Sequence, residues 1–251
     1  MKLEISEKLQ SRLVPETKVV VLTGAGISAE SGVPTFRGKE GLWKKFRPEE
    51  LATFEAFMAN PKLVWEWYQY RRKLLEQVKP NLGHKALVDF QKFFSGFTLI
   101  TQNVDGLHQK AGSFDTVELH GNIKRNRCIS CGKIFESLKN LKEKNPPVCD
   151  CGGRIRPDVV WFGEMLPQDA LQKAFFVSSN CELFFSIGTS AVVHPAASLP
   201  IMAKRGGAYL IEVNIEPTEL SFITDEKLLG KAGEILPEIV KFFRKNSQKD
   251  M

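Results

Sequence analysis

Four of the five cysteines in this 251-residue chain fall in one segment, as Cys128-x-x-Cys131 and Cys149-x-Cys151. Two close thiolate pairs with glycines behind them are typical of a zinc ribbon, in which four sulfurs hold one ion in a closed tetrahedron. The second pair has one intervening residue instead of the usual two, which makes that knuckle tighter. No histidine or carboxylate in the segment suggests an open coordination position. We therefore predict one structural zinc that performs no chemistry.

A glycine turn follows the first strongly apolar run of the chain. Residues 19–22 read as a buried strand, and Gly24-x-Gly26-x-x-Ala29 comes directly after it. A strand, a tight glycine turn and a helix start form the arrangement that brings backbone N–H groups to a pyrophosphate. A purely structural turn is the alternative. Residues 41–48 contain no strand ending in an acidic ribose reader, so the nucleotide is held differently from that of an ordinary dehydrogenase.

Three further apolar runs each lead into a short polar group. The runs and their polar groups are residues 97–101 with 102–105, 183–187 with 188–190, and 208–213 with 214–216. Strands that alternate with helices predict a parallel sheet wound on both sides, whose carboxyl ends share one edge. The polar groups are then expected to line one ligand crevice.

Helical patterns surround these runs. We expect helices over residues 3–13, 83–94 and 234–245, and an aromatic-rich helical region over 48–79 in which Pro61 begins a second helix. Residues 31–38 form a loop that could fold over a bound ligand, with a plain surface connection as the alternative. The sequence thus predicts an α/β fold.

Composition narrows the classes of protein that fit. The chain is 43% hydrophobic and 25% charged, which is typical of a globular protein, and its net charge is +6. Lysine and arginine are spread along the chain, so a solvated surface is favoured over a nucleic-acid face. No apolar run approaches the length of a transmembrane helix, and the N-terminal residues are charged, unlike a signal peptide. We expect a cytoplasmic protein with no membrane contact and, in the absence of heptads or a large apolar face, a monomer.

Taken together, the motifs resemble those of the sirtuin family of NAD-dependent protein lysine deacylases. Besides the four cysteines, they are Gly24-Ala25-Gly26-Ile27-Ser28-Ala29-Glu30-Ser31-Gly32, Pro34-Thr35-Phe36-Arg37, Thr101-Gln102-Asn103-Val104-Asp105, His120-Gly121, Phe162-Gly163-Glu164 and Gly188-Thr189-Ser190. The resemblance runs from about residue 18 to the closing helix. It implies a Rossmann-type doubly wound parallel sheet formed by residues 1–40, 81–123 and 157–251. A smaller domain would be built from two insertions, the helical residues 41–80 and the zinc ribbon 124–156.

The resemblance also implies a reaction. In sirtuins NAD loses nicotinamide, the acyl-lysine oxygen attacks the ribose, and O-acyl-ADP-ribose and free lysine result. His120 matches the catalytic histidine, and histidine suits a base that works near neutral pH. Asn103 would organise water and ribose, and Asp105 would belong to the nicotinamide pocket. The other histidines, His84, His108 and His194, lack this context and are interpreted as structural or surface residues.

The resemblance further implies which residues contact the cofactor and the substrate. The predicted NAD contacts are Gly24, Ala25, Gly26, Glu30, Thr35, Phe36, Arg37, Gln102, Asn103, Asp105, Gly188, Thr189, Ser190, Asn214, Glu216 and Ala232. The stretch that would pair with the backbone of an acylated protein substrate comprises Val160, Trp161, Phe162, Gly163 and Glu164. Chromatin proteins are among the substrates considered, and no direct nucleic-acid role is expected.

The pair Tyr68-x-x-Arg71 matches the sirtuin branch that removes acidic acyl groups. The two residues share a helix face, where arginine can hold a carboxylate in a bidentate pair and tyrosine can donate one more hydrogen bond. On this basis we expect desuccinylase or demalonylase activity beside deacetylase activity. A core tyrosine beside an exposed arginine is the alternative.

Two other functions remain open from the sequence. An ADP-ribosyltransferase that passes ADP-ribose to a protein acceptor would use the same NAD site. A zinc-ribbon nucleic-acid-binding module fits the basic charge, but polar motifs at four strand ends argue against it.

Overall fold

The large part of the molecule is a six-stranded sheet. The computed structural model describes residues 4–35, 47–138 and 145–247. The sheet has the order β3-β2-β1-β7-β8-β9, and every neighbouring pair is parallel. Its strands are β1 (Lys18–Thr23), β2 (Gly96–Thr101), β3 (Val117–Glu118), β7 (Leu183–Ile187), β8 (Tyr209–Asn214) and β9 (Glu226–Leu229). The predicted doubly wound parallel sheet is confirmed.

The register of these strands explains why their polar ends meet. Thr23 at the end of β1 is paired with Thr101 of β2 and with Ile187 of β7, and Ile187 is paired with Val213 of β8. The four central strands therefore end level with one another. Whatever follows each strand is placed along a single edge.

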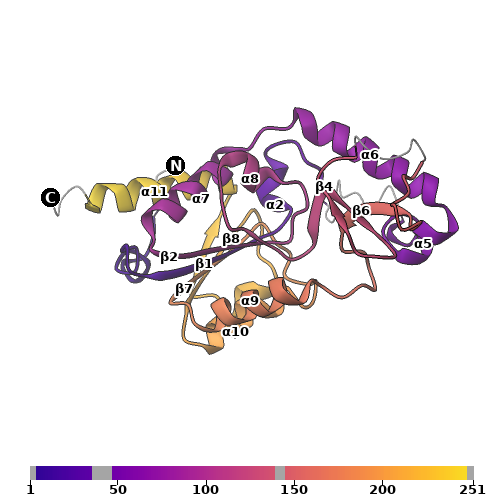
Figure 1. The fold of residues 1–251 in the computed structure, drawn as a ribbon. Helices are drawn as coiled ribbons and strands as arrows, with labels where there is room; N and C mark the ends of the chain where they lie inside the picture. Colours follow the sequence, from indigo (N-terminus) through magenta and orange to yellow (C-terminus); the bar gives the residue numbers. More distant parts are fainter. Residues whose placement is uncertain (1–3, 36–46, 139–144, 248–251) are drawn as a thin grey trace.

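Helices cover both faces of the sheet (Figure 1). One face carries α7 (Leu82–Phe93) and α11 (Ala232–Ser247), and the other carries α9 (Gln168–Ser179) and α10 (Ser198–Arg205). Alternate residues of each strand feed the two cores: Val19 and Val21 join the first, Val20 and Leu22 the second. This burial on both sides explains why the central strands are almost continuously apolar.

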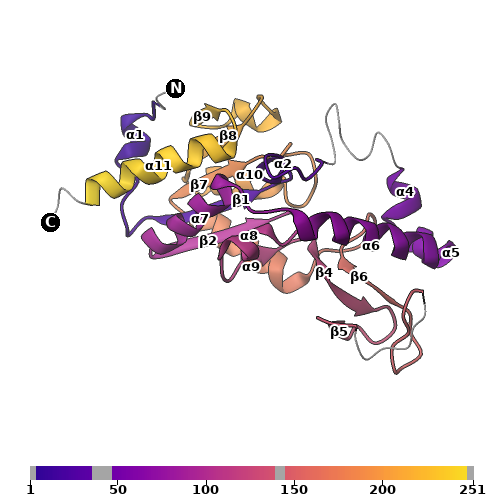
Figure 2. The same cartoon turned by 90° about the horizontal axis from the view of Figure 1, so that it is seen from above.

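A second, smaller part lies beyond one end of the sheet (Figure 2). It contains a three-stranded antiparallel sheet in the order β5-β4-β6, formed by β4 (Gly121–Cys128), β5 (Ile134–Phe135) and β6 (Ile155–Val159). Three helices accompany it: α4 (Pro48–Leu51), α5 (Phe54–Ala59) and α6 (Pro61–Gln77). Their shared core includes Phe57, Tyr68 and Trp161.

Several helices differ from the sequence prediction. The first is short, α1 (Glu7–Gln10), and the turn after β1 leads into α2 (Gly26–Ala29), a single turn. Thr53 caps α5 through its hydroxyl, so the first predicted helix of the insertion is split at Ala52–Thr53. The short helix α8 (Leu107–Ala111), the 3₁₀ turn η1 (Glu219–Phe222), α9 and α10 were not predicted. None of the helices in the described ranges combines the length and apolar character needed to cross a bilayer.

Candidate functional site

A cavity of about 1520 Å³ lies along the carboxyl ends of the central strands and reaches α6 and the segment after β6. Nearly all of the residues predicted to contact NAD or the protein substrate line it. They are Gly24, Ala25, Gly26, Glu30, Thr35, Tyr68, Arg71, Gln102, Asn103, His120, Val160, Trp161, Phe162, Gly163, Glu164, Gly188, Thr189, Ser190, Asn214, Glu216 and Ala232. Phe36 and Arg37 lie outside the described residues. The cavity is large enough for a dinucleotide together with an extended peptide.

Two glycine turns meet backbone to backbone at the floor of the cavity. The Gly24 N–H donates to the Ile187 carbonyl and the Gly26 N–H to the Gly188 carbonyl, at 2.9 and 2.8 Å. A Cβ on Gly24 would lie 2.7 Å from the Gly188 oxygen, and one on Gly26 equally close to the Gly188 Cα. Gly188 itself has a positive φ of 58°. Only glycine permits this contact, and the bare backbone leaves room for phosphate groups.

The next turns are joined through side chains. The Asn214 amide donates to the Thr189 carbonyl at 3.0 Å, and the Gln102 amide donates to the Thr189 hydroxyl at 3.0 Å. Glu30 accepts a hydrogen bond of 2.8 Å from the Gly233 N–H in the first turn of α11. These contacts hold the ends of four strands and the start of α11 in fixed relation.

Asn103 is buried at the end of β2. Its side-chain amide donates to the Gly24 carbonyl at 2.9 Å, and its backbone N–H donates to the Thr101 hydroxyl at 3.0 Å. Asn103 therefore orients the first glycine turn as well as lining the cavity. Its amide oxygen contributes an acceptor without bringing a formal charge.

Asp105 is the one described residue of the predicted NAD set that does not line the cavity. It is buried and accepts hydrogen bonds from the Ser28 hydroxyl at 2.7 Å and the Leu107 N–H at 2.8 Å. Burial raises the pKa of its carboxyl group, while these hydrogen bonds and the charges of Arg71 and Lys124 lower it. The structure places Asp105 behind the cavity wall, where it supports Ser28.

His84 and His108 form a buried pair beside this network. Their ring centroids are 4.9 Å apart, and His108 Nε2 lies 2.9 Å from the Thr23 hydroxyl. Burial lowers the pKa of His84 to about 4, and burial together with the nearby His84 lowers that of His108 to about 3. Both rings are therefore neutral at physiological pH. No periodicity or motif in the sequence indicated that these two residues would meet.

His120 lines the cavity at the start of β4. Its Nδ1 lies 2.9 Å from the Gln102 carbonyl oxygen, which can only accept, so Nδ1 carries the proton. The neutral ring then has its lone pair on Nε2. Burial lowers the pKa of His120, and the hydrogen bond to Gln102 partly opposes that shift. The arrangement supplies a neutral base with a fixed tautomer.

Tyr68 and Arg71 project from one face of α6 into the far end of the cavity. Tyr68 is almost fully buried, and the Arg71 guanidinium lies 4.9 Å from the Trp67 ring centroid and 5.9 Å from that of Tyr68. The structure thus brings the two residues together as a tyrosine hydroxyl and a cation within one cavity wall. That pair can recognise a carboxylate.

The segment after β6 is shaped by Arg156, which is buried. Its guanidinium forms two hydrogen bonds with the Glu164 carboxylate and lies over the Trp161 ring, 3.3 Å from the centroid. Glu164 also accepts from the Trp161 N–H at 2.8 Å. The Phe162 N–H donates to the Ala52 carbonyl at 2.9 Å, which ties this segment to the helical insertion. No motif in the sequence indicated a role for Arg156, although it lies four residues before the predicted peptide-binding stretch 160–164.

The four cysteines of the segment 128–151 converge. All their sulfurs lie within 4.8 Å of one another, with 3.5 Å between Cys128 and Cys151 and 3.8 Å between Cys131 and Cys149. A tetrahedron with Zn–S bonds of ~2.3 Å has edges of about 3.8 Å, so the residues fit zinc. A Cβ on Gly153 would lie 2.6 Å from the Cys128 sulfur, which explains the glycine behind the tight knuckle. Cys181 is buried separately, in the core of the large sheet.

Residues that follow β8 line the cavity beyond the predicted pair Asn214 and Glu216. They are Ile215, Pro217, Thr218, Glu219 and Phe222. The buried Glu212 carboxylate accepts hydrogen bonds from the hydroxyls of Thr218 and Ser221 and fixes the course of this segment. In the sequence, these residues were marked only by their position directly after the end of a predicted strand.

Comparison with known proteins gives a consistent result. The Sir2 family profile matches residues 24–195. An NAD-dependent protein deacylase of Aquifex aeolicus (strain VF5) is 54% identical over 227 residues, which cover 90% of this chain and 95% of the relative. A solved mutant Sir2 homologue in complex with ADP-ribose has a TM-score of 0.91 at 46% identity, covering 97% of this chain and 98% of that chain. A Sir2 protein with a deacetylated p53 peptide and 3'-O-acetyl ADP-ribose has a TM-score of 0.80 at 36% identity, covering 94% and 97%.

Proposed function

The chain belongs to the Sir2 family, and from this membership we propose that it is an NAD-dependent protein deacylase that acts on acylated lysine side chains. One observation carries the proposal. A single cavity is lined by the paired glycine turns, the Gln102–Asn103 amides and a histidine whose tautomer is fixed by the Gln102 carbonyl. Such a cavity has what a reaction between a dinucleotide and an acyl-lysine needs: a phosphate cradle, uncharged polar groups and a neutral base.

We assign the residues at one end of the cavity to NAD and those at the other end to the protein substrate. Gly24, Gly26 and Gly188 would admit the pyrophosphate, with Asn214 and Glu216 toward the adenosine side. Bound NAD would supply an ADP-ribosyl group that takes up the acyl group as nicotinamide departs. His120 would accept a hydroxyl proton at Nε2, since Nδ1 already donates to Gln102.

Contacts with the protein substrate are proposed at the other end of the cavity. Residues 160–164 would pair with the backbone of a protein segment, because this stretch lines the cavity beside Ala52 and follows the edge strand β6. Acylated proteins are therefore the proposed partners, in keeping with the p53 peptide of the Sir2 relative. Chromatin proteins as substrates, a monomeric state and a cytoplasmic location stay predictions.

The acyl group itself would meet Tyr68 and Arg71. A succinyl or malonyl group ends in a carboxylate, which Arg71 would pair with while the Tyr68 hydroxyl donates a further hydrogen bond. An acetyl group would leave Arg71 without that partner but would not clash. We therefore include desuccinylase and demalonylase activity in the proposal, beside deacetylase activity.

A turnover panel tests both parts. Purified protein receives NAD and one peptide carrying acetyl-, succinyl- or unmodified lysine, and nicotinamide release is followed with product identification. Release that requires an acylated peptide and yields an acyl-ADP-ribose is expected, and His120→Ala should abolish it. Radiolabelled NAD is used in a parallel assay. Nicotinamide release without an acylated peptide, together with label on the protein, would indicate ADP-ribosyl transfer and contradict the proposal.

A substitution at Arg71 tests the acyl pocket separately. Arg71→Met should lower kcat/KM for the succinyl peptide by roughly 10- to 100-fold, the equivalent of losing a charged hydrogen-bonded pair, while acetyl turnover persists. Unchanged succinyl turnover would remove Arg71 from the pocket. Lys73→Met is the control, because Lys73 is an exposed cation on the same helix.

A further inference from the structure

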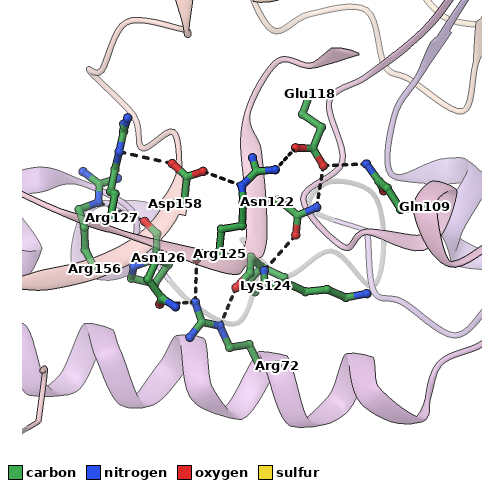
Figure 3. A network of polar contacts seen from close by, with 12 residues as sticks. Arg72, Gln109, Glu118, Asn122, Lys124, Arg125, Asn126, Arg127, Arg156 and Asp158 are labelled. Carbon is green, nitrogen blue, oxygen red and sulfur yellow. Dashed lines mark hydrogen bonds and ion pairs between the residues drawn. The ribbon is translucent and has the colours of Figure 1, made fainter. Parts of the chain in front are cut away.

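Arg72, the neighbour of Arg71 on α6, is not among the residues that line the cavity. Its side chain instead reaches β4 (Figure 3). Its Nε donates to the Ile123 carbonyl at 2.6 Å, and its Nη2 donates to the Arg125 carbonyl at 3.0 Å and to the Asn126 side-chain oxygen at 2.7 Å. The guanidinium also lies 5.6 Å from the centroid of the Trp65 ring. One side chain thus binds three acceptors within residues 123–126 of a strand of the small sheet.

Those acceptors occur where β4 leaves its partner strand. Asn122 is paired with Asp158 and Asn126 with Pro157, so residues 123–125 have no counterpart on β6. We call residues 123–125 the β4 bulge. Its carbonyl groups lack the ladder hydrogen bonds that a regular antiparallel strand would provide. Arg72 takes the place of the missing strand for two of them.

Among the residues that the structure describes, the carboxylates near Arg72 are paired with other cations. The nearby carboxylates are bound by other arginines, Glu118 by Arg125 at 2.7 Å and Asp158 by Arg125 and Arg127 at 3.0 and 3.3 Å (Figure 3). The three hydrogen bonds that Arg72 donates to described residues all go to uncharged oxygens. Burial lowers its pKa to about 10, which still leaves it charged at neutral pH. A half-buried cation held by three oriented dipoles fixes geometry more than it neutralises charge.

The contact joins the two ends of the catalytic cavity. On one side, α6 presents Tyr68 and Arg71 to the proposed acyl position. On the other, β4 begins immediately after His120, and the Ile123 N–H donates to the Val104 carbonyl at 2.9 Å, next to Asn103. Movement of α6 against β4 would therefore change the distance between the acyl pocket and the base.

We propose that Arg72 is a positioning residue that holds the acyl-pocket helix at a fixed distance from the strand carrying His120. This inference rests on the proposed deacylase function for its kinetic consequence and on the geometry of α6 and β4 for its structural one. Arg72 touches neither the cavity nor its contents, so it acts through Tyr68, Arg71 and His120.

The test compares Arg72→Met, which keeps the aliphatic stem, with Lys73→Met as the matched control. In hydrogen–deuterium exchange, the Ile123 and Lys124 amides should exchange faster in Arg72→Met only. In the panel, kcat should fall by roughly 10- to 100-fold, as expected for misplacement of reacting groups by about 1 Å. The ratio of succinyl to acetyl turnover should change, whereas KM for NAD should stay within about twofold, because the glycine turns are not bound by Arg72.

The conservative variant Arg72→Lys keeps the charge but replaces the planar fork of donors with a single ammonium group. It should show intermediate exchange and intermediate kcat, and it serves if Arg72→Met does not fold. Exchange of the two amides equal to that of Lys73→Met would overturn the proposal. So would faster exchange with unchanged kcat and acyl selectivity. Absence of deacylase activity in the unmodified protein would defeat the proposed function, while the exchange data would still decide the contact between Arg72 and the β4 bulge.

Discussion

The indole Nε1 of Trp161 donates a hydrogen bond of 2.8 Å to the hydroxyl oxygen of Tyr68. Both side chains are almost fully buried, and the two residues come from different parts of the chain, α6 and the segment after β6. Because the Tyr68 oxygen accepts this bond, its own proton is available for donation toward the cavity that Tyr68 lines. Burial raises the pKa of Tyr68, so the proton stays in place at neutral pH.

Replacing Trp161 by phenylalanine should therefore change acyl selectivity more than overall activity. Trp161→Phe keeps a ring for Arg156 to cover but removes the N–H that orients the Tyr68 hydroxyl. We expect the ratio of succinyl to acetyl kcat/KM to fall about 3- to 10-fold, as for one hydrogen bond of ordinary strength. Trp65→Phe is the control, because Trp65 packs near the cysteine cluster instead. An equal drop for both acyl peptides would contradict the orienting role.

The pH dependence of turnover should reflect the lowered pKa of His120. Burial disfavours the imidazolium ion, so His120 loses its proton below the ordinary value of 6.5 and is already a neutral base at pH 7. We expect the acid limb of the kcat/KM profile to have its midpoint below 6.5, the ordinary value for histidine. An NMR titration of the His120 ring should give the same midpoint as the rate profile. A midpoint above 6.5 would argue against a buried neutral base.

The buried pair His84 and His108 should make the protein sensitive to acid. Their pKa values are about 4 and about 3 in the folded state and near 6.5 when unfolded, so the unfolded state binds more protons between these limits. Their contribution to the free energy of unfolding is therefore complete above pH 6.5 and is lost as the pH falls toward 4 and 3. Each histidine should remove about 1.4 kcal/mol of unfolding free energy per pH unit in that window.

Denaturant unfolding of His108→Gln at several pH values isolates one of these contributions. The slope of unfolding free energy against pH should be smaller than in the unmodified protein by that amount. Asp105, whose pKa is raised, titrates in the opposite sense in both proteins and cancels in the comparison. His194→Asn is the control, because His194 is an exposed histidine outside this buried pair. A slope unaffected by His108→Gln would mean that His108 is protonated in the folded protein.

Zinc removal should unfold the small sheet selectively. We expect one equivalent of zinc per chain by elemental analysis and its loss in Cys131→Ser, with increased exchange of β5 and of the first turns of α6, where Trp65 packs against Cys128 and Cys149. Cys181→Ala should keep its zinc, since Cys181 lies in the core of the large sheet. Well below one equivalent in a folded unmodified protein would contradict the zinc prediction.

The central strands were predictable because each is a short apolar run that ends in turn-forming residues. Residues 183–187 are buried on both faces, and a strand of that kind has a continuous apolar sequence. Helix α9 was missed for the opposite reason. Its apolar residues do not keep to one face, since Phe176 is exposed while Ala174 and Ser178 are buried. Pro200 near the start of α10 likewise masked a regular helix.

The site was predictable where a motif marks it and not where the fold brings distant residues together. The spacing of residues within the glycine turn and within the cysteine pairs was enough to predict phosphate binding and metal binding. Nothing in the spacing of Arg72 and Ile123, or of Tyr68 and Trp161, says that they meet, because those contacts depend on how α6 lies against the small sheet. The burial of Asp105 behind Ser28 was hidden for the same reason.

The pairing of Gly121 with Val159 has a consequence for the architecture as a whole. The chain leaves at Gly121, builds β4, β5 and the cysteine cluster, and returns at Val159 to the point from which it departed. The Val160 N–H then donates to the His120 carbonyl at 3.0 Å, so the exit and the return are joined. The portion that carries the cysteine cluster is thus an insertion whose first and last residues are hydrogen-bonded to each other. A change in the length of its outer loops would therefore leave the separation of His120 from residues 160–164 unaltered.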